Sequence, residues 1–492
     1  CVQDWGGTVT FNNQSQFVFD SPGTKVSGVF DFTKNNNLLY VKQSVTFQSS
    51  SSKWGDDSEI KIANAATLAY IDNQWETQGT LTKTGSTMTW NNVAWTLSDD
   101  TSYSSDTAIA TKTLTLNNHL LTLASLDSDL TVTDNLTFDN SGEQIITGLA
   151  DLTLQGGFIL EDGLLSSTGG KVSFEKGAGQ SGGSLDVSDS TLKLGDNYIK
   201  TAGTLTATGD GTILELTESL SFTSNTPVSV KTLSLNDKTL TLGSVSSEVM
   251  SFSTVLQVSS ALILDNSNER VMTGAADLSL LASLDISDGG VISTGGTISL
   301  LAGGQLSGSG ELDLSGSTWV LGGDFDKRSA VGSLLSGTLT ISQTDLKLAG
   351  NSKLTSDEAL SFVTLNLNNF KLTLGSSTSD LTVINAITID AITEGISTGE
   401  ADLILMSALT MSEGLLGSTG GTWVLRKDFL KSGGTLTISQ TDLELEDNIK
   451  LTSDQALSFV FGTLNLNNFT LTLGNSTSDL TVENAITIDA IT

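Results

Sequence analysis

The sequence has very little of several residue types on which common protein chemistries depend. Its 492 residues include one cysteine, Cys1, one histidine, His119, and only two prolines. A single cysteine excludes an intramolecular disulfide, so the fold must be stabilised by packing and backbone hydrogen bonds. One histidine and one cysteine also exclude the usual zinc ligand sets and leave no readily assembled Ser-His-Asp triad.

Positive charge and long apolar runs are also scarce. The chain has 23 basic and 55 acidic residues, for a formal net charge of −32, which repels nucleic acid phosphates and anionic lipid headgroups. No stretch approaches the roughly 18 apolar residues that a membrane-spanning helix needs. We therefore expect no nucleic acid partner and no membrane-spanning segment.

What the sequence does contain is internal repetition. One unit occurs four times, a second occurs three times and a third occurs three times, and they recur in the same order. The copies are "TLTLNNHLLTL" (113–123), "TLSLNDKTLTL" (232–242), "TLNLNNFKLTL" (364–374) and "TLNLNNFTLTL" (463–473); "ITGLADLTL" (146–154), "MTGAADLSL" (272–280) and "STGEADLIL" (397–405); and "LLSSTGGKVSF" (164–174), "VISTGGTISL" (291–300) and "LLGSTGGTWVL" (415–425). The chain is thus built from super-repeats of roughly 100 to 130 residues.

Within each unit, polar and apolar residues alternate over four to six positions, which is typical of a half-buried strand. This alternation predicts that Leu114, Leu116, Leu365 and Leu367 point inward. Asn-Asn, Thr-Gly, Gly-Gly and Ser-Asp pairs separate the runs and favour turns. The segment "TSDEALSF" (355–362) is the nearest approach to a helix, and we interpret it as a corner or one helical turn at most.

Short strands in tandem leave three candidate folds: sandwich arrays, a propeller or a β-solenoid. The drifting period, with no buried Trp or Cys hallmark in each copy, favours a solenoid, whose coils contact only their neighbours. We predict an all-β parallel β-helix (β-solenoid), with degenerate super-repeats over residues 101–492 that end mid-repeat. Residues 1–100 contain Trp5, Trp54, Trp75, Trp90 and Trp95 and are predicted to form a Trp-rich N-terminal cap and the first coils. A glycan-stacking platform is the alternative role for these tryptophans.

Segments such as "TLTLNNHLLTLASLDSDLTVTDNLTF" resemble the parallel β-helix repeats of filamentous-haemagglutinin-type adhesins and autotransporter passenger domains. The resemblance covers most of residues 100–492 and lies in composition and period, without a diagnostic motif. It implies a surface-exposed right-handed β-helix and no catalytic residues. Cys1 resembles the lipidated first residue of mature bacterial lipoproteins, although the sequence contains no lipobox. A processing product or a free thiol is the alternative interpretation of Cys1.

The recurrent acids have positions typical of turns. Asp129, Glu248, Asp380 and Asp479 precede strands of the "LTV" type, and Asp151, Asp277 and Asp402 follow an alanine in "ADL". Each fits a cap whose carboxylate accepts backbone N–H bonds. His119 corresponds to Lys238, Phe370 and Phe469 in the other copies, which indicates a turn exterior. We expect no enzymatic activity and no cofactor. Calcium is the most reasonable ion, with oxygen-rich segments at 322–327, 184–190 and 206–212.

The copies agree in the residues that build a coil and differ where side chains meet water. Lys347 becomes Glu444, and Lys371 becomes Thr470, which argues against a flat threonine lattice that binds ice. We expect an extracellular structural or adhesive rod, displayed on the cell surface as a spacer or filament subunit. A carbohydrate-binding or carbohydrate-active β-helix, similar to phage tailspikes or lyases, is the alternative. Expected partners are a second copy, head to tail, and a surface or matrix glycan, with an outer-membrane lipid anchor only through Cys1.

The last residues repeat an internal segment. Residues 478–492 match residues 379–393, after which the earlier copy continues into "EGISTGEADL". The super-repeat is therefore interrupted at an exposed strand edge. Three explanations stay open: continuation in a longer polypeptide, docking of another subunit, or a frayed last coil.

Overall fold

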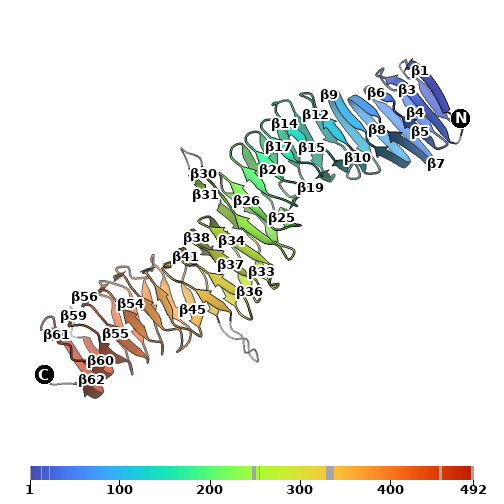
Figure 1. Cartoon of the computed structure of the whole chain (residues 1–492). Helices are drawn as coiled ribbons and strands as arrows, with labels where there is room; N and C mark the ends of the chain where they lie inside the picture. The colour runs from blue at the N-terminus through green and yellow to red at the C-terminus, as the bar shows by residue number, and fades with distance from the viewer. Residues whose placement is uncertain are drawn as a thin grey trace. The chain divides into compact units, whose positions relative to one another are not determined.

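A computed structural model describes residues 2–12, 14–21, 23–246, 251–253, 255–327, 337–453 and 457–488. Every regular element in this described part is a β-strand, and the strands stack in parallel, coil upon coil (Figure 1). Leu130 lies opposite Leu152, and Leu152 lies opposite Val172 in the following coil. The prediction of an all-β parallel β-solenoid is confirmed, with about 21 coils in the part of the chain that the structure describes.

The chain divides into two compact units. Unit 1 comprises Cys1–Lys238 and Val245–Phe252, and unit 2 comprises Thr239–Ser244 and Ser253–Thr492. This division does not test the predicted boundary at residue 100. The short strands β30 (Ser244–Ser246) and β31 (Ser251–Ser253) pair with each other.

The other strands of unit 1 are β1 (Val2–Thr10), β2 (Gln16–Phe19), β3 (Thr24–Phe32), β4 (Leu38–Val41), β5 (Val45–Gln48), β6 (Ser51–Trp54), β7 (Ser58–Ile71), β8 (Gln74–Asn91), β9 (Ala94–Ser105), β10 (Ile109–Thr111), β11 (Thr113–Thr115), β12 (Leu120–Leu123), β13 (Leu130–Val132), β14 (Leu136–Phe138), β15 (Gln144–Gly148), β16 (Leu152–Leu154), β17 (Phe158–Leu160), β18 (Leu164–Ser167), β19 (Lys171–Phe174), β20 (Ala178–Gln180), β21 (Ser184–Asp186), β22 (Thr191–Leu194), β23 (Tyr198–Lys200), β24 (Thr204–Thr206), β25 (Ile213–Leu216), β26 (Leu220–Ser224), β27 (Val228–Val230) and β28 (Thr232–Ser234).

The other strands of unit 2 are β29 (Thr239–Leu242), β32 (Val255–Val258), β33 (Leu262–Leu264), β34 (Arg270–Gly274), β35 (Asp277–Leu280), β36 (Leu284–Ile286), β37 (Gly290–Ser293), β38 (Thr297–Leu300), β39 (Gly304–Leu306), β40 (Glu311–Asp313), β41 (Thr318–Leu321), β42 (Phe325–Lys327), β43 (Thr338–Thr340), β44 (Asp345–Leu348), β45 (Ser352–Ser356), β46 (Leu360–Phe362), β47 (Thr364–Asn366), β48 (Lys371–Leu374), β49 (Leu381–Val383), β50 (Ile387–Ile389), β51 (Gly395–Ser397), β52 (Leu403–Leu405), β53 (Leu409–Met411), β54 (Leu415–Ser418), β55 (Thr422–Leu425), β56 (Phe429–Lys431), β57 (Thr435–Ile438), β58 (Asp442–Leu445), β59 (Ile449–Ser453), β60 (Leu457–Asn465), β61 (Leu471–Leu473) and β62 (Ser478–Thr487).

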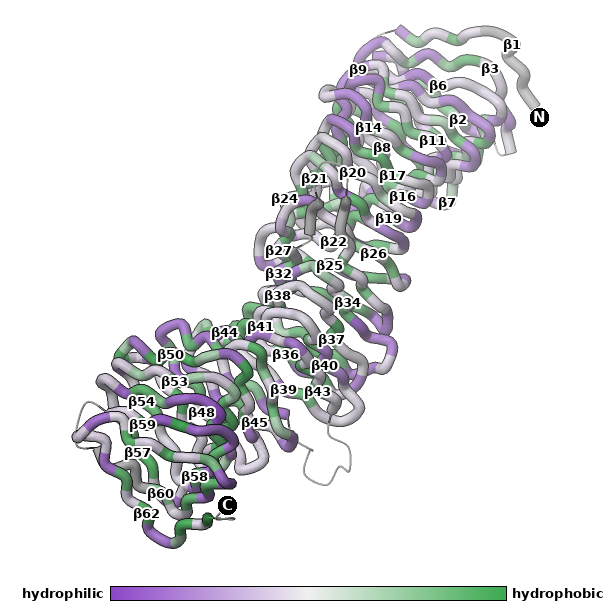
Figure 2. The backbone as a smooth tube through the Cα atoms, turned by 60° about the vertical axis from the view of Figure 1, so that its left-hand side comes forward, coloured by the Kyte–Doolittle hydropathy of each residue, from purple (hydrophilic) through white to green (hydrophobic). Residues whose placement is uncertain are grey.

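The core of each unit is the space that the coils enclose. Buried and outward residues alternate along most strands. Figure 2 shows the accompanying change between hydrophobic and hydrophilic residues along the coils. Leu114, Leu116, Leu365 and Leu367 are all buried, which confirms their predicted inward direction. The segment at 355–362 forms a corner between β45 and β46, without a helical turn. Alternation alone therefore located the core positions of these repeats.

Aromatic side chains fill the core of the first coils in unit 1. Phe32 stacks on Trp54, with ring centroids 4.5 Å apart, and Trp75 lies 5.6 Å beyond Trp54. Trp75, Trp90 and Trp95 continue the series at 4.2 and 5.5 Å. Such contacts add about 0.5–1.5 kcal/mol each to the burial of the rings. The aromatic-rich N-terminal region thus contains a continuous internal series of ring contacts.

Candidate functional site

Four lysines are buried at equivalent positions of the coil, and the sequence analysis did not single them out. Each is at most 1% exposed, and each lies opposite a buried serine of the next coil. The pairs are Lys83 with Ser105, Lys200 with Ser224, Lys327 with Ser356, and Lys431 with Ser453. Burial of an ammonium group is costly unless it is paired, so these positions are the strongest candidates for a special role.

Two of the lysines meet carboxylates that directly follow the opposite serine. The Nζ of Lys83 lies 2.5 Å from Asp106 Oδ1 and donates to Thr107 Oγ1 at 2.9 Å. The Nζ of Lys327 lies 2.5 Å from Asp357 Oδ1 and 3.2 Å from Glu358 Oε1. The lysine stem therefore fills the core while the charge is neutralised at the coil corner.

Lys200 differs because the residue after its serine is an asparagine. Its Nζ donates to Asn225 Oδ1 and, at 3.1 Å, to Thr226 Oγ1. The Asn225 amide in turn donates to the Thr201 carbonyl oxygen at 2.7 Å. Burial lowers the pKa of Lys200 below its ordinary value. An amide solvates the ammonium group but supplies no counter-charge.

These corners coincide with places where a new sheet begins. β10, β27 and β46 are terminal strands of their sheets, and they follow Ser105, Ser224 and Ser356 by a few residues. The side chains of Lys83, Lys200 and Lys327 are almost completely excluded from solvent, so a substrate has no access to them. The lysine corners are therefore equipped to hold two coils in register, and not to act as nucleophiles.

The recurrent aspartates form hydrogen bonds between coils. Asp129 Oδ1 accepts the Asp151 N–H at 2.8 Å, and Asp151 Oδ1 accepts the Lys171 N–H at 2.7 Å. Asp277 Oδ1 accepts the Thr297 N–H at 2.7 Å. The expectation that these carboxylates accept backbone N–H bonds is confirmed, with the donor lying one coil further along.

Unit 2 contains the same arrangement of aspartates. Asp380 Oδ1 accepts the Asp402 N–H at 2.9 Å, and Asp402 Oδ1 accepts the Thr422 N–H at 2.6 Å. Asp479 is exposed on β62, and Glu248 lies outside the described residues. A catalytic carboxylate pair needs one acid in a low-dielectric pocket, whereas these acids are occupied as hydrogen-bond acceptors.

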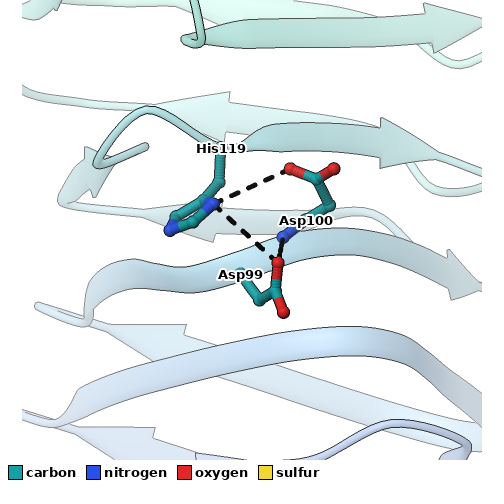
Figure 3. Close-up of side chains that lie close together, drawn as sticks. All are labelled: Asp99, Asp100 and His119. Carbon is teal, nitrogen blue, oxygen red and sulfur yellow. Dashed lines mark hydrogen bonds and ion pairs between the residues drawn. The ribbon is translucent and has the colours of Figure 1, made fainter.

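His119 is less isolated than its sequence position indicates. Its Nδ1 lies 3.7 Å from Asp100 Oδ1 and 4.0 Å from Asp99 Oδ1 (Figure 3). The two aspartates lie on one coil, and the histidine lies on the next. The same oxygen atoms already accept backbone N–H bonds, from Leu120 to Asp100 and from Asp100 to Asp99. A spacing of about one coil between residues 99 and 119 was the signal that would have predicted this contact.

The His119, Asp99 and Asp100 cluster is the single group of three metal-ligand side chains found among the described residues. Both aspartates are about 70% exposed, so the cluster resembles a solvated surface contact more than an enclosed ion site. The predicted calcium segments have other hydrogen-bond partners. Asp324 accepts the Lys353 N–H, and Asp186 accepts both the N–H and the hydroxyl of Ser188. In the segment at 206–212, Asp210 pairs with Lys231 at 3.1 Å.

A shallow cavity of about 500 Å³ lies on the outer face of β16, β19 and β22 in unit 1. Lys171, Lys193, Glu175 and Glu218 line it, and Lys193 pairs with Glu215 at 3.4 Å. The volume is in the range of ligand sites, but the aromatic ring that lines it, Phe174, is only 1% exposed. The cavity therefore offers no aromatic face on which a sugar would stack.

Three tryptophans of the N-terminal coils point into the core. Trp54, Trp75 and Trp95 are at most 1% exposed, which removes them from a glycan-stacking surface. Trp90 is half-buried against Trp75 and Trp95. The side chain of Trp5 and the whole of Cys1 lie outside what the structure describes. The predicted lipidation of Cys1 thus stays a prediction.

Comparison with known proteins finds no matching family model, no matching curated protein and no matching solved structure. Among the residues that the structure describes, no helix is long and apolar enough to span a membrane. The fold and the geometry of these sites are therefore the basis for the functional argument.

Proposed function

We propose that this chain is a structural or adhesive rod protein of the extracellular space, displayed on the cell surface as a stiff spacer or filament subunit. One observation supports this proposal above all others. The repeated polar groups, namely the aspartates, the asparagines and the buried lysines, form hydrogen bonds from one coil to the next. A chain whose recurrent polar groups hold coils together is suited to bearing load along the stack.

Backbone hydrogen bonds also resist the separation of coils under load. Each coil is joined to its neighbours by short parallel ladders on several faces, so separating two coils breaks many hydrogen bonds at once. The net charge of −32 keeps such a molecule soluble and discourages lateral association of the rods. An adhesive role would then use weak contacts repeated along the outer faces.

Single-molecule force spectroscopy tests the mechanical part of the proposal. We expect the intact chain to unravel in small steps of about one coil, roughly 20 residues, at forces well above those of helical repeat proteins. A glycan array and a polysaccharide turnover screen test the carbohydrate alternative on the same preparation. Catalytic turnover of a polysaccharide would replace the rod proposal with the lyase-like one.

The location of the protein is part of the same proposal. We infer that a natively produced form carries acyl chains on Cys1, which would tether the acidic rod to an outer membrane. Mass spectrometry of the N-terminal peptide from native material is the direct measurement. An unmodified Cys1 in that peptide would contradict the lipid anchor without affecting the mechanical test.

A further inference from the structure

A second cavity of unit 1 is lined by a tryptophan that is partly exposed. It lies at the end of β8, beside β10, and has a volume of about 360 Å³. Trp90 lines this cavity and is half-buried, whereas Trp75 and Trp95 are at most 1% exposed. The cavity at β8 and β10 therefore has a partly accessible aromatic residue, which the larger cavity over β16, β19 and β22 lacks.

This cavity lies where one sheet ends and another begins. The last residues of β8, 87–91, pair with residues 67–71 of β7 in the preceding coil. β10 lies beside β8 but is the terminal strand of a different sheet (Figure 1). Because β8 and β10 belong to different sheets, the ladder that closes the wall between the earlier coils is interrupted at this point. The interruption explains why Trp90 stays in contact with solvent.

Neighbouring rings fix the position of Trp90. Its ring centroid lies 4.2 Å from that of Trp75, 5.5 Å from that of Trp95 and 6.4 Å from that of Tyr70. The indole Nε1 of Trp90 is buried, so the side chain can present only ring carbons to a ligand. A ring that is already held by its neighbours loses little conformational entropy when a ligand binds.

Polar side chains line the same cavity. Asn91, Lys112 and Asp134 are all exposed there. Among the residues that the structure describes, these three side chains have no hydrogen-bond or ion-pair partner, unlike the recurrent aspartates that join the coils. Asn92 also lines the cavity, and its amide donates to Asp72 Oδ1. The cavity thus offers an amide, an ammonium group and a carboxylate, which together provide both donors and acceptors.

We propose that this cavity binds one neutral hexopyranose unit of a glycan, with the sugar ring on Trp90 and its hydroxyl groups hydrogen-bonded to Asn91 and Asp134. The C–H groups on one face of a pyranose are weakly positive and match the negative face of an aromatic ring. Its hydroxyl groups need both donors and acceptors, which the amide and the carboxylate supply. The volume of about 360 Å³ is in the range of small-ligand sites. The inference rests on the proposed adhesive function and names a ligand class for it.

The charges in and around the cavity favour a neutral sugar over an anionic ligand. Lys112 and Asp134 contribute one charge of each sign, and the carboxylate of Asp72 lies next to Asn92. The net charge of −32 on the whole chain repels phosphorylated and polyanionic molecules. A nucleotide, whose base would also stack on a tryptophan, is disfavoured for this reason.

Saturation-transfer difference NMR on the full chain tests the proposal. The probes are the methyl glycosides of glucose, galactose, mannose and N-acetylglucosamine, each at millimolar concentration. Sorbitol is the control, because it carries hydroxyl groups but has no ring face. After irradiation of the aromatic protons, we expect saturation to reach the ring C–H protons of at least one glycoside and not those of sorbitol. No signal from any of the glycosides would overturn the proposal, as would tighter binding of glucuronic acid than of every neutral sugar.

Two variants assign the binding to this cavity. The double variant N91A/D134A changes only exposed side chains, and W90F keeps an aromatic ring among the buried ones. We expect each to raise the Kd for the glycoside by about tenfold, while K171A, in the larger cavity, leaves it unchanged. A Kd that is the same in N91A/D134A and the wild-type chain would overturn the site. In that case, glycan binding by both proteins would still support the adhesive function, whereas force spectroscopy tests the rod separately.

Discussion

Lys200 shows how the residues at a coil corner set the surroundings of a buried ammonium group. Its neighbours along the coil are Ile199, which is 48% exposed, and Tyr198, which is 1% exposed, so the apolar isoleucine faces water while the lysine is buried. Lys83 and Lys327 occupy the same position and form ion pairs with Asp106 and Asp357. The asparagine at 225 is therefore the exception. Burial lowers the pKa of Lys200, and the Asn225 amide supplies no charge that would offset this effect.

Replacing Asn225 with aspartate should stabilise unit 1. A lysine whose folded pKa is below its ordinary value binds fewer protons than the unfolded chain, so stability rises with pH between the two values and is lower beneath them. N225D supplies the missing counter-charge, returns the pKa of Lys200 toward its ordinary value and removes this pH dependence. We expect a gain of about 1–3 kcal/mol near neutral pH, measured by urea unfolding at several pH values.

The matched variant for this prediction is K200M, which fills the same core space without a charge. In the K200M background, N225D should give no gain, because the aspartate has no ammonium group to pair with. A similar gain from N225D in both backgrounds would show that the effect does not pass through Lys200.

The inter-coil aspartates give a second prediction at this scale. D151A should remove the acceptor of the Lys171 N–H and cost about 1 kcal/mol, while D151N keeps an acceptor oxygen and should cost less. The direct readout is faster hydrogen exchange at the Lys171 amide in D151A. The exposed Asp127 provides the control, and a D127A variant should leave that amide unchanged.

Much of the residue pattern was accessible from the sequence, and the buried lysines show the limit. For the leucines in "TLTL" runs, hydropathy and alternation both predict an inward direction. In "YIK" and "FDK" these two criteria conflict, since hydropathy places lysine outside. The register with the preceding coil decides the direction, and a single sequence does not contain that register.

At the level of the turn, the paired asparagines have two distinct tasks. Asn117 and Asn118 both have positive φ, at 51° and 67°, which Asn tolerates better than most residues. In addition, the Asn117 amide donates to the Leu97 carbonyl oxygen of the preceding coil at 2.9 Å. The first asparagine of the other copies makes the same bond, from Asn236 to Leu216, from Asn368 to Leu348 and from Asn467 to Leu445.

These tasks predict different effects of glycine at the two positions. N118G should change the free energy of unfolding by less than about 0.5 kcal/mol, because glycine adopts positive φ without strain. N117G also permits the turn but loses the bond to Leu97, so we expect a cost of about 1 kcal/mol. Thermal unfolding of the two variants beside N118V, which forces a β-branched residue into positive φ, completes the comparison. Equal costs for N117G and N118G would contradict the assigned role of Asn117.

One short sequence that occurs in two places of the chain explains why element boundaries were harder to predict than element types. Residues 387–389 form the separate strand β50, whereas residues 486–488 end the long strand β62 and the segment after it. The two triplets are identical, so the sequence window carries no information that separates them. Neighbouring coils supply the difference. The Asn385 N–H donates to the Val363 carbonyl oxygen at a corner before β50, whereas β62 continues along β60, past a register shift, as far as Thr487.

At the scale of each unit, the solenoid makes stability a local property. Trp319 in unit 2 is completely buried, lies between Ile298 and Leu346 on the adjoining strands, and contacts the rings of Phe325 and Phe362 at 5.0 and 6.1 Å. Trp75 in unit 1 is also buried, lies between Ser52 and Trp95 on the adjoining strands, and contacts the rings of Trp54 and Trp90 at 5.6 and 4.2 Å. Each unit therefore offers one tryptophan whose removal damages a known set of coils.

W319A should cost about 3–5 kcal/mol locally, because it opens a cavity that the neighbouring side chains fill only in part. Since each coil contacts only its neighbours, hydrogen exchange should accelerate in β38, β41 and β44 and stay unchanged in β6, β8 and β9. W75A should give the reverse pattern. Exchange measured by mass spectrometry on both variants resolves these segments in one experiment. If W319A accelerated exchange equally in the two units, the chain would unfold as one cooperative body, and the nearest-neighbour description of its stability would be wrong.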